Sequence, residues 1–266
     1  MWLRHWGLDR DPFDERRSPF AETPTHAEAV ARLVHSIESA VRSARLVAGS
    51  GLGKSRVLAR ALEATRSPIR RVARANGLAD GPDLFARLAA GLGARLAPDA
   101  SPSAAWRALA ESSRLCRWQG VHVVLAIDDC QALDEGPGRA DLDRLDHLDT
   151  DPSARLTVLQ VGRPSERQDD PGRADAWDLA IRLGPLSRSE AAGYLATRLA
   201  AAGRPEPAFT PRALTRLHAL SGGAPRGLDR LGALALMAGA VRGLEVVPPD
   251  VVEDASRECL VVGTIG

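Results

Sequence analysis

Lysine is almost absent from this sequence. Among 266 residues, with Lys+Arg 35 and Asp+Glu 34, the only lysine is Lys54, and arginine supplies every other permanently charged basic side chain. The formal net charge is +1, so the overall charge favours no class of partner. Nucleic acid is therefore neither indicated nor excluded by composition.

Cysteine and long apolar runs are also scarce. The three cysteines (Cys116, Cys130 and Cys259) are too few and too scattered for a disulfide framework or a zinc site, which predicts a reduced, cytoplasmic setting. The six histidines show no ligand spacing. No charged-then-apolar leader opens the chain, and the longest apolar stretch, residues 231–241, is too short for a membrane span. We expect no integral membrane segment.

The single lysine stands in a glycine-rich segment that is typical of a phosphate-binding loop. The segment consists of Ala48, Gly49, Ser50, Gly51, Leu52, Gly53, Lys54 and Ser55. A short apolar strand precedes it and an amphipathic helix follows, so its backbone N–H groups would converge on phosphate oxygens at a helix N-terminus. Lys54 would contact the β- and γ-phosphates, and the Ser55 hydroxyl would bind Mg²⁺. The alternative is a glycine-rich turn with an accidental lysine.

A second candidate element is the apolar run 121–127, which ends in two acids, Asp128 and Asp129. Its length and β-branched content favour a buried parallel strand, and ligands of open α/β sheets bind beyond the carboxyl ends of strands. Asp128 would then hold Mg²⁺ through water, and Asp129 would orient the attacking water and accept its proton. The plainer alternative is two acids that cap the exit from a strand.

Periodicity and capping signals predict an α/β core followed by helices only. The expected strands are 45–48, 69–74, 121–127, 155–161 and 179–183, and the expected helices are 26–41, 56–63, 83–92, 103–116, 139–148, 187–202, 210–220, 225–240 and 249–258. This order of strands inserts an extra strand between the strand that precedes the phosphate-binding loop and the strand that ends in the two acids. One lysine leaves no room for an Asn-Lys-x-Asp guanine signature, so ATP is the expected nucleotide.

The helices after residue 186 read as a small lid. Residues 221–226 join two of them, with a glycine turn that ends one helix and Pro225 that begins the next. Arg226 falls in the first turn of that helix, where a cation is unfavourable unless an anion faces it. Phosphate contact would explain its position.

Motifs along nearly the whole chain resemble one known family. They are the opening Trp2-Leu-x-His-Trp-Gly-Leu with Pro12-Phe13, the phosphate-binding loop, Ile127-Asp-Asp-Cys-Gln131, Leu145-Asp-His-Leu-Asp-Thr150, Val161-Gly-Arg-Pro164, Leu183-Gly-Pro-Leu186-Ser and Gly223-Ala-Pro-Arg226. In this order they are similar to the ExeA-type AAA+ ATPases, the general secretion pathway protein A-like group, which is related to the MuB and TniB transposition ATPases.

The resemblance implies a P-loop NTPase AAA+ fold of the ASCE type: a five-stranded parallel sheet flanked by helices, with a small all-helical C-terminal lid. It also implies ATP and Mg²⁺ at their junction, and assembly into a homo-oligomer. The expected division is an aromatic arm over residues 1–24, a nucleotide-binding core over 25–186 and the lid over 187–266. Asp128 matches the Walker B aspartate and Arg226 the sensor arginine.

Three departures from the family pattern bear on activity. Asp129 replaces the usual glutamate and is one methylene shorter, so hydrolysis would be slow. The family arginine that serves a neighbouring subunit is missing at 175–177, where Arg173 is the nearest substitute. Arg163 replaces a glutamine, either as a surface residue or as a phosphate sensor. The leading hypothesis is an ATPase that drives conformational change or assembly; the rival is an ATP-loaded adaptor with little hydrolysis.

The partner is left open by the sequence. The adaptor hypothesis expects a DNA- or membrane-associated partner, and the related proteins act in transposition or secretion. The N-terminal arm also has two interpretations: Pro12, Phe13 or Phe20 close over the adenine, or the arm covers the apolar edge of the core. The second is preferred, because large apolar side chains are usually buried against a core.

Overall fold

The computed structural model describes residues 1–14, 17–80, 83–133, 137–145, 147–148, 151, 154–164 and 178–262. Contacts between residues divide the chain into two compact units. The helical unit comprises Met1–Ala27, Ser50–Gly53 and Gly184–Gly266, and the sheet unit comprises Glu28–Gly49 and Lys54–Leu183. The boundaries predicted at residues 24/25 and 186/187 stay a prediction.

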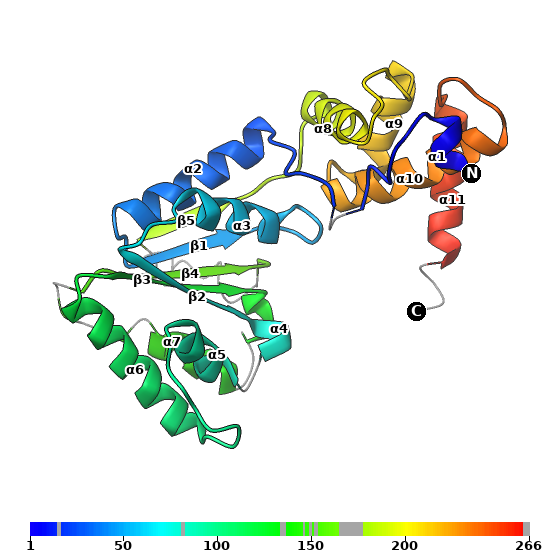
Figure 1. The fold of residues 1–266 in the computed structure, drawn as a ribbon. Coiled ribbons are helices and arrows are strands. Elements are labelled where there is room, and N and C mark those ends of the chain that lie inside the picture. The colour runs from blue at the N-terminus through cyan, green and yellow to red at the C-terminus, as the bar shows by residue number, and fades with distance from the viewer. Residues whose placement is uncertain are drawn as a thin grey trace. The chain divides into compact units, whose positions relative to one another are not determined.

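The sheet unit is built on five parallel strands: β1 (Ser43–Val47), β2 (Arg70–Asn76), β3 (His122–Asp128), β4 (Leu156–Gly162) and β5 (Leu179–Arg182). Their spatial order is β2-β3-β4-β1-β5, so β4 is the extra strand between β1 and β3 (Figure 1). Every residue of β3 and β4 is buried, as continuous apolar runs require in a sheet covered on both faces. The predicted parallel five-stranded sheet is confirmed.

Helices flank the sheet. They are α2 (Pro24–Glu38), α3 (Lys54–Ala64), α4 (Gly77–Asp80), α5 (Leu84–Gly91), α6 (Pro102–Trp118), the 3-10 turn η2 (Cys130–Ala132) and α7 (Pro137–Leu145). Ser101 caps α6, because its side chain accepts a hydrogen bond from the backbone of Ala104, so the helix begins one residue before the predicted start at 103. The short α4 and η2 were not predicted, since single turns leave no periodic signal in the sequence.

The helical unit contains α1 (Trp2–His5), α8 (Arg188–Ala201), α9 (Pro211–Ser221), α10 (Pro225–Val241) and α11 (Pro249–Val262). Its caps match the sequence signals: Ser187 and Glu190 form a capping box at α8, and Gly222 ends α9 with a φ of 59°. The predicted helical C-terminal part is confirmed, and outside its helices Phe209 and Val247 form an isolated parallel bridge.

The N-terminal arm completes the core of the helical unit. Trp6 and Phe13 are buried among residues of α8 and α10, and the Trp6 indole donates to the carbonyl of Leu236 at 2.7 Å. A Cβ at Gly239 would lie 2.9 Å from the Trp6 ring, so a glycine makes room for the indole. The arm was expected to cover the apolar edge of the core. It begins with helix α1 and places Trp6 and Phe13 in the core of the helical unit.

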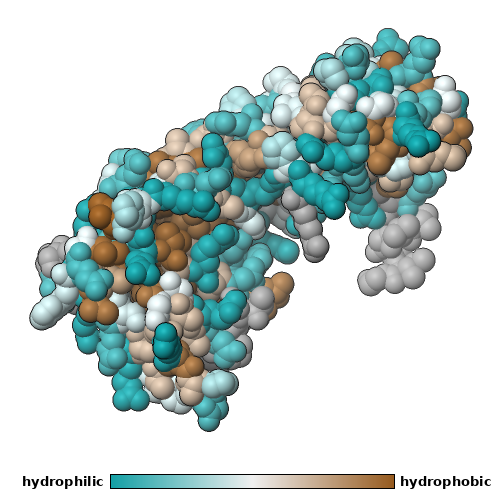
Figure 2. Space-filling view, in the orientation of Figure 1, coloured by the Kyte–Doolittle hydropathy of each residue, from teal (hydrophilic) through white to brown (hydrophobic). Residues whose placement is uncertain are grey.

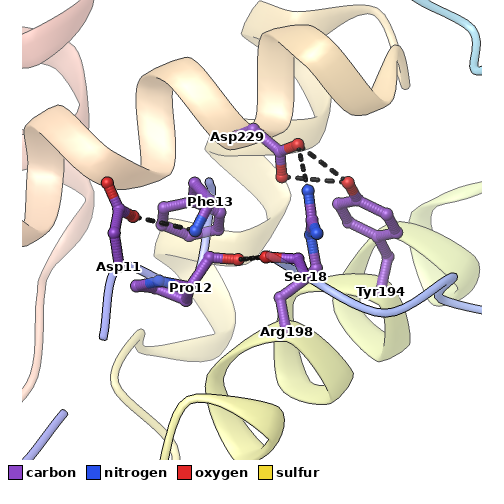
Figure 3. A network of polar contacts seen from close by, with 7 residues as sticks. All are labelled: Asp11, Pro12, Phe13, Ser18, Tyr194, Arg198 and Asp229. Carbon is purple, nitrogen blue, oxygen red and sulfur yellow. Dashed lines mark hydrogen bonds and ion pairs between the residues drawn. The ribbon is translucent and has the colours of Figure 1, made fainter. Parts of the chain in front are cut away.

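A charged network lies buried in the same unit (Figure 3). The Arg198 guanidinium, 1% exposed, donates to Asp229 at 2.7 Å, and the Tyr194 hydroxyl donates to the same carboxylate at 2.9 Å. Burial alone would lower the pKa of Arg198, but its hydrogen bond and ion pair with Asp229 outweigh that effect and raise it. The pair therefore stays charged inside an apolar core.

We predict that Asp229→Asn destabilises the protein by about 3–5 kcal/mol, because it leaves the buried Arg198 cation without a counter-charge. Tyr194→Phe, which removes one neutral donor from the same carboxylate, should cost about 1 kcal/mol. Urea unfolding followed by circular dichroism measures both. Equal losses for the two variants would show that the ion pair contributes no more than the hydroxyl.

His122 gives the sheet unit a pH dependence. It is 1% exposed, its Nδ1 accepts from Arg70 Nε at 3.3 Å, and its Nε2 therefore carries the proton toward Thr157 Oγ1 at 3.0 Å. Burial, with the charges of Arg70 and Arg155, lowers the pKa of His122 from 6.5 to about 4. The unfolded chain thus binds a proton at higher pH than the folded protein does.

The stability contributed by neutral His122 should be present above pH 6.5 and be lost as the pH falls toward 4. In His122→Asn, whose amide keeps an acceptor for Arg70 and a donor for Thr157, this component should be missing. The measurement is the free energy of unfolding of both proteins against pH. A constant difference between them across this window would contradict the assignment.

Candidate functional site

The glycine-rich loop joins β1 to α3 and surrounds the lysine side chain. Lys54 is 8% exposed, and its Nζ donates to the carbonyls of Ala48 at 3.0 Å and Gly49 at 2.9 Å. Gly51 and Gly53 have φ values of 74° and 89°, which residues with a Cβ rarely adopt. The loop thus curls around the ammonium, and the glycines permit that path.

Helix α3 begins at Lys54, directly after the loop. No acidic residue lies in its first turn, and Ser55 is exposed there. The unpaired N–H groups of a helix N-terminus and the helix dipole both favour an anion. With the lysine beside it, this end of α3 has the chemistry of a phosphate site.

The tip of the loop, Ser50–Gly53, is contacted by other segments of the helical unit. His26 Nε2 lies 3.0 Å from the Leu52 carbonyl oxygen, and because a carbonyl only accepts, Nε2 must carry the proton. His26 Nδ1 then accepts from the Thr23 hydroxyl at 2.9 Å. A Cβ at Gly53 would lie 3.0 Å from His26 Nε2, so the imidazole packs directly on the loop.

No pattern in the sequence indicated a role for His26, because the six histidines show no metal-ligand spacing. Its position could have indicated a role, because His26 lies in the first turn of the helix that precedes the loop strand. Thr23, three residues earlier, caps that helix: its hydroxyl oxygen accepts from the His26 backbone N–H at 3.3 Å. Its contact with Leu52 spans 26 positions of sequence.

Arg226 also reaches the loop tip. Its backbone N–H donates to the Gly51 carbonyl at 3.1 Å, and a Cβ at Gly51 would lie 3.0 Å from the Arg226 Cβ. Arg226 is in the first turn of α10, after Pro225 at the first helical position. The structure therefore brings this predicted residue to the loop through its backbone.

The two acids lie at the carboxyl end of β3. Asp128 is 9% exposed, and its Oδ1 accepts from the backbone N–H of Asp129 at 2.9 Å. Asp129 has left-handed backbone angles, φ 52° and ψ 39°, which aspartate tolerates better than most residues. This turn of the backbone takes Asp129 out of the strand.

Two amide side chains hold the Asp129 carboxylate. Asn76 Nδ2 donates to Oδ2 at 3.0 Å, and Gln131 Nε2 donates to Oδ1 at 3.0 Å. Gln131 Oε1 in turn accepts from the backbone N–H of Arg163 at 3.0 Å. Asn76 ends β2 and is in register with Asp128 on β3, which is why it reaches this carboxylate.

These contacts set the charge of Asp129. Burial acts to raise its pKa, but the hydrogen bonds from Gln131 and Asn76, with the charges of Lys54 and Arg163, outweigh burial and lower it. Asp129 is therefore ionised at neutral pH. Lys54 and Asp129 lie within electrostatic reach of each other, and their joint role in a nucleotide site stays a prediction.

The remaining predicted residues have simpler positions. Arg163 is exposed, and its charge is one of those that act on Asp129. Arg173 and residues 175–177 lie outside the described residues.

Across the ranges that the structure describes, no helix is long and apolar enough to cross a membrane, and no three His, Cys, Asp or Glu side chains form a metal cluster.

Comparison with known proteins gives similarity over most of the chain. No family model matches. General secretion pathway protein A of Aeromonas hydrophila is 28% identical over 250 residues, which cover 91% of this chain and 46% of that protein. The chain thus spans about half the length of this relative.

Solved structures show the fold. Cdc6p from Pyrobaculum aerophilum has a TM-score of 0.75 at 20% identity and covers 94% of this chain and 71% of its own. The Aeropyrum pernix ORC2 protein, solved in ADPNP–ADP complexes, has a TM-score of 0.69 at 16% identity and covers 94% and 72%. The chain has the AAA+ P-loop fold and, over most of its length, resembles the ExeA-type ATPases.

Proposed function

We propose that this protein binds ATP with Mg²⁺ and hydrolyses it to drive a conformational change or assembly with a partner. The observation that carries the proposal is the Lys54 ammonium held inside the glycine loop at the start of α3. Residues 48–55 would surround the phosphates, with Lys54 on the β- and γ-phosphates. Arg226, whose backbone contacts the loop tip, would sense the γ-phosphate.

The residues present fit a magnesium ion that is carried mainly by the nucleotide. Mg²⁺ keeps several waters and takes few protein ligands when phosphate oxygens are available. The exposed Ser55 hydroxyl and the Asp128 carboxylate are oxygen donors of the right kind, and the described residues offer no dense carboxylate cage that would favour another metal. Bound there, the ion would neutralise charge on the phosphates.

Asp129 would act as the base for the attacking water. It is ionised, as a base must be, but both of its oxygens already accept hydrogen bonds from Asn76 and Gln131. A lowered pKa also weakens its affinity for the proton. Each carboxylate oxygen keeps a second lone pair that can accept from the water, so the weakened proton affinity of Asp129 is the reason to expect slow hydrolysis.

This restraint is the reason to keep a second candidate function. A protein that binds ATP but seldom hydrolyses it would act as a switch or adaptor that recruits a DNA- or membrane-associated partner. Assembly into a homo-oligomer fits either function. The similarity to general secretion pathway protein A covers only part of that protein, so a role in secretion or transposition is itself a proposal.

Replacement of Lys54 tests nucleotide binding. Lys54→Ala should weaken ATP binding at least about tenfold in magnesium buffer, because the loop loses its only side-chain cation. Lys54→Arg should not restore affinity, since a planar guanidinium does not fit a position built for a compact ammonium. Isothermal titration calorimetry measures both. Unchanged affinity in Lys54→Ala, with the fold intact by circular dichroism, would refute the phosphate site.

Replacement of Asp129 separates the two functions. Asp129→Asn should leave ATP affinity nearly unchanged and lower turnover about 10²–10⁴-fold if Asp129 is the base. Steady-state phosphate release and ATP binding are measured on the same preparations. If the wild type releases phosphate no faster than Asp129→Asn, hydrolysis through this residue is ruled out and the adaptor function is favoured.

A further inference from the structure

A groove lies beside β2 in the sheet unit, and neither the phosphate site nor the acidic pair uses it. Its volume is about 610 Å³, and it is formed by the second half of α3, the turn after it and one face of β2. The side chains that line it include Leu62, Glu63, Arg66, Arg70, Val72 and Arg74. In Figure 2, brown apolar residues are visible between teal hydrophilic ones on the face where Figure 1 places α3 and β2.

The strand beside this groove has an open edge. Among the residues that the structure describes, β2 is the terminal strand of the sheet and pairs with β3 alone. The Ile69 carbonyl accepts from His122 of β3 at 2.9 Å, and successive backbone groups of a strand point to opposite sides. The N–H and C=O groups of Val72 and Arg74 therefore point away from β3, and no described residue forms a hydrogen bond with them.

The side chains of the groove have an excess of positive charge. Glu63, the acid that lines it, pairs with Arg60 at 3.4 Å, and Arg70 is engaged by His122 and the Thr65 carbonyl. Arg66 and Arg74 are exposed, and neither forms an ion pair with a residue that the structure describes. Two uncommitted cations therefore flank a floor of Leu62 and the half-buried Val72.

We propose that this groove binds an acidic, extended segment of a partner protein as a sixth strand added to β2. The backbone of Val72 and Arg74 would pair with the segment, and carboxylates on one face of it would meet Arg66 and Arg74. A nucleic acid fits less well, because the groove offers aliphatic side chains in place of aromatic stacking surfaces and leaves the strand edge unused. The inference does not depend on nucleotide binding.

The probe is a fluorescein-labelled peptide of about eight residues that alternates glutamate with valine or threonine, a length that matches a strand of this size. Fluorescence anisotropy with the full chain measures its affinity. A peptide with lysine in place of glutamate, and a labelled DNA duplex, are the comparison ligands. We expect saturable binding of the glutamate peptide that weakens with salt, and at least tenfold weaker binding of the lysine peptide.

Three variants locate the site. Arg66→Glu combined with Arg74→Glu should weaken the glutamate peptide at least about tenfold, since attraction becomes repulsion at two exposed positions. Val72→Pro should also weaken it, because it removes an N–H that points to the open edge and leaves the pairing with β3 intact. The matched control is Arg71→Glu, an exposed arginine of the same strand whose side chain faces away from the groove.

The outcomes are decisive in both directions. Loss of binding in the two groove variants but not in Arg71→Glu supports the proposal. No saturable binding of the glutamate peptide would overturn it, and would assign the arginines to protecting the strand edge from unwanted pairing. Equal losses in all three variants, or binding of the DNA duplex without the peptide, would overturn it as well.

Discussion

The Lys54 ammonium inside its glycine loop is the interaction on which the candidate site depends. Two loop carbonyls hold the side chain, and the backbone can take this path only because Gly51 and Gly53 adopt positive φ angles. The loop also starts α3, so the charge of the lysine and the dipole of the helix act at one place. Substitution of either glycine would strain the backbone and bring a Cβ against Arg226 or His26.

In the acidic half of the candidate site, the Asp129 carboxylate is restrained by hydrogen bonds. Asp129 is kept ionised by two amides and by nearby positive charges, and these same contacts occupy both of its oxygens. A carboxylate held in this way is well placed, and each oxygen keeps a second lone pair for a water, but its lowered pKa makes it a weak proton acceptor. The geometry thus links the rate of any hydrolysis to the positions of Asn76 and Gln131, which end β2 and follow β3.

The helical unit is organised around contacts between the two ends of the chain. Trp6 and Phe13 fill space between C-terminal helices where Gly239 and Gly232 leave room for rings. The buried pair of Arg198 and Asp229 adds a polar contact whose partners must be correctly placed, because an unpaired charge in such a core is costly. The core of the helical unit is therefore constrained both by the packing of its aromatic rings and by the need to pair its buried charges.

Much of the local structure and the residue types of the candidate site could be predicted from sequence. Glycine spacing indicated the phosphate loop, the apolar run before Asp128 indicated a buried strand, and Ser187 with Glu190 marked a helix start, because each signal acts within a few residues. Contacts between distant segments could not be predicted in this way. Asn76 reaches Asp129 across 53 positions, and His26 reaches Leu52 across 26.

What the sequence by itself determined is therefore the strands, the longer helices and the residue types expected of a phosphate and metal site. Only the tertiary structure decided that Asp129 is restrained by two amides, that His26 packs on the loop tip, and that the aromatic arm belongs to the core of the helical unit. The physical reason is that periodicity and capping report which face of an element is apolar. They carry no information on the strand register or helix packing that brings two such faces together.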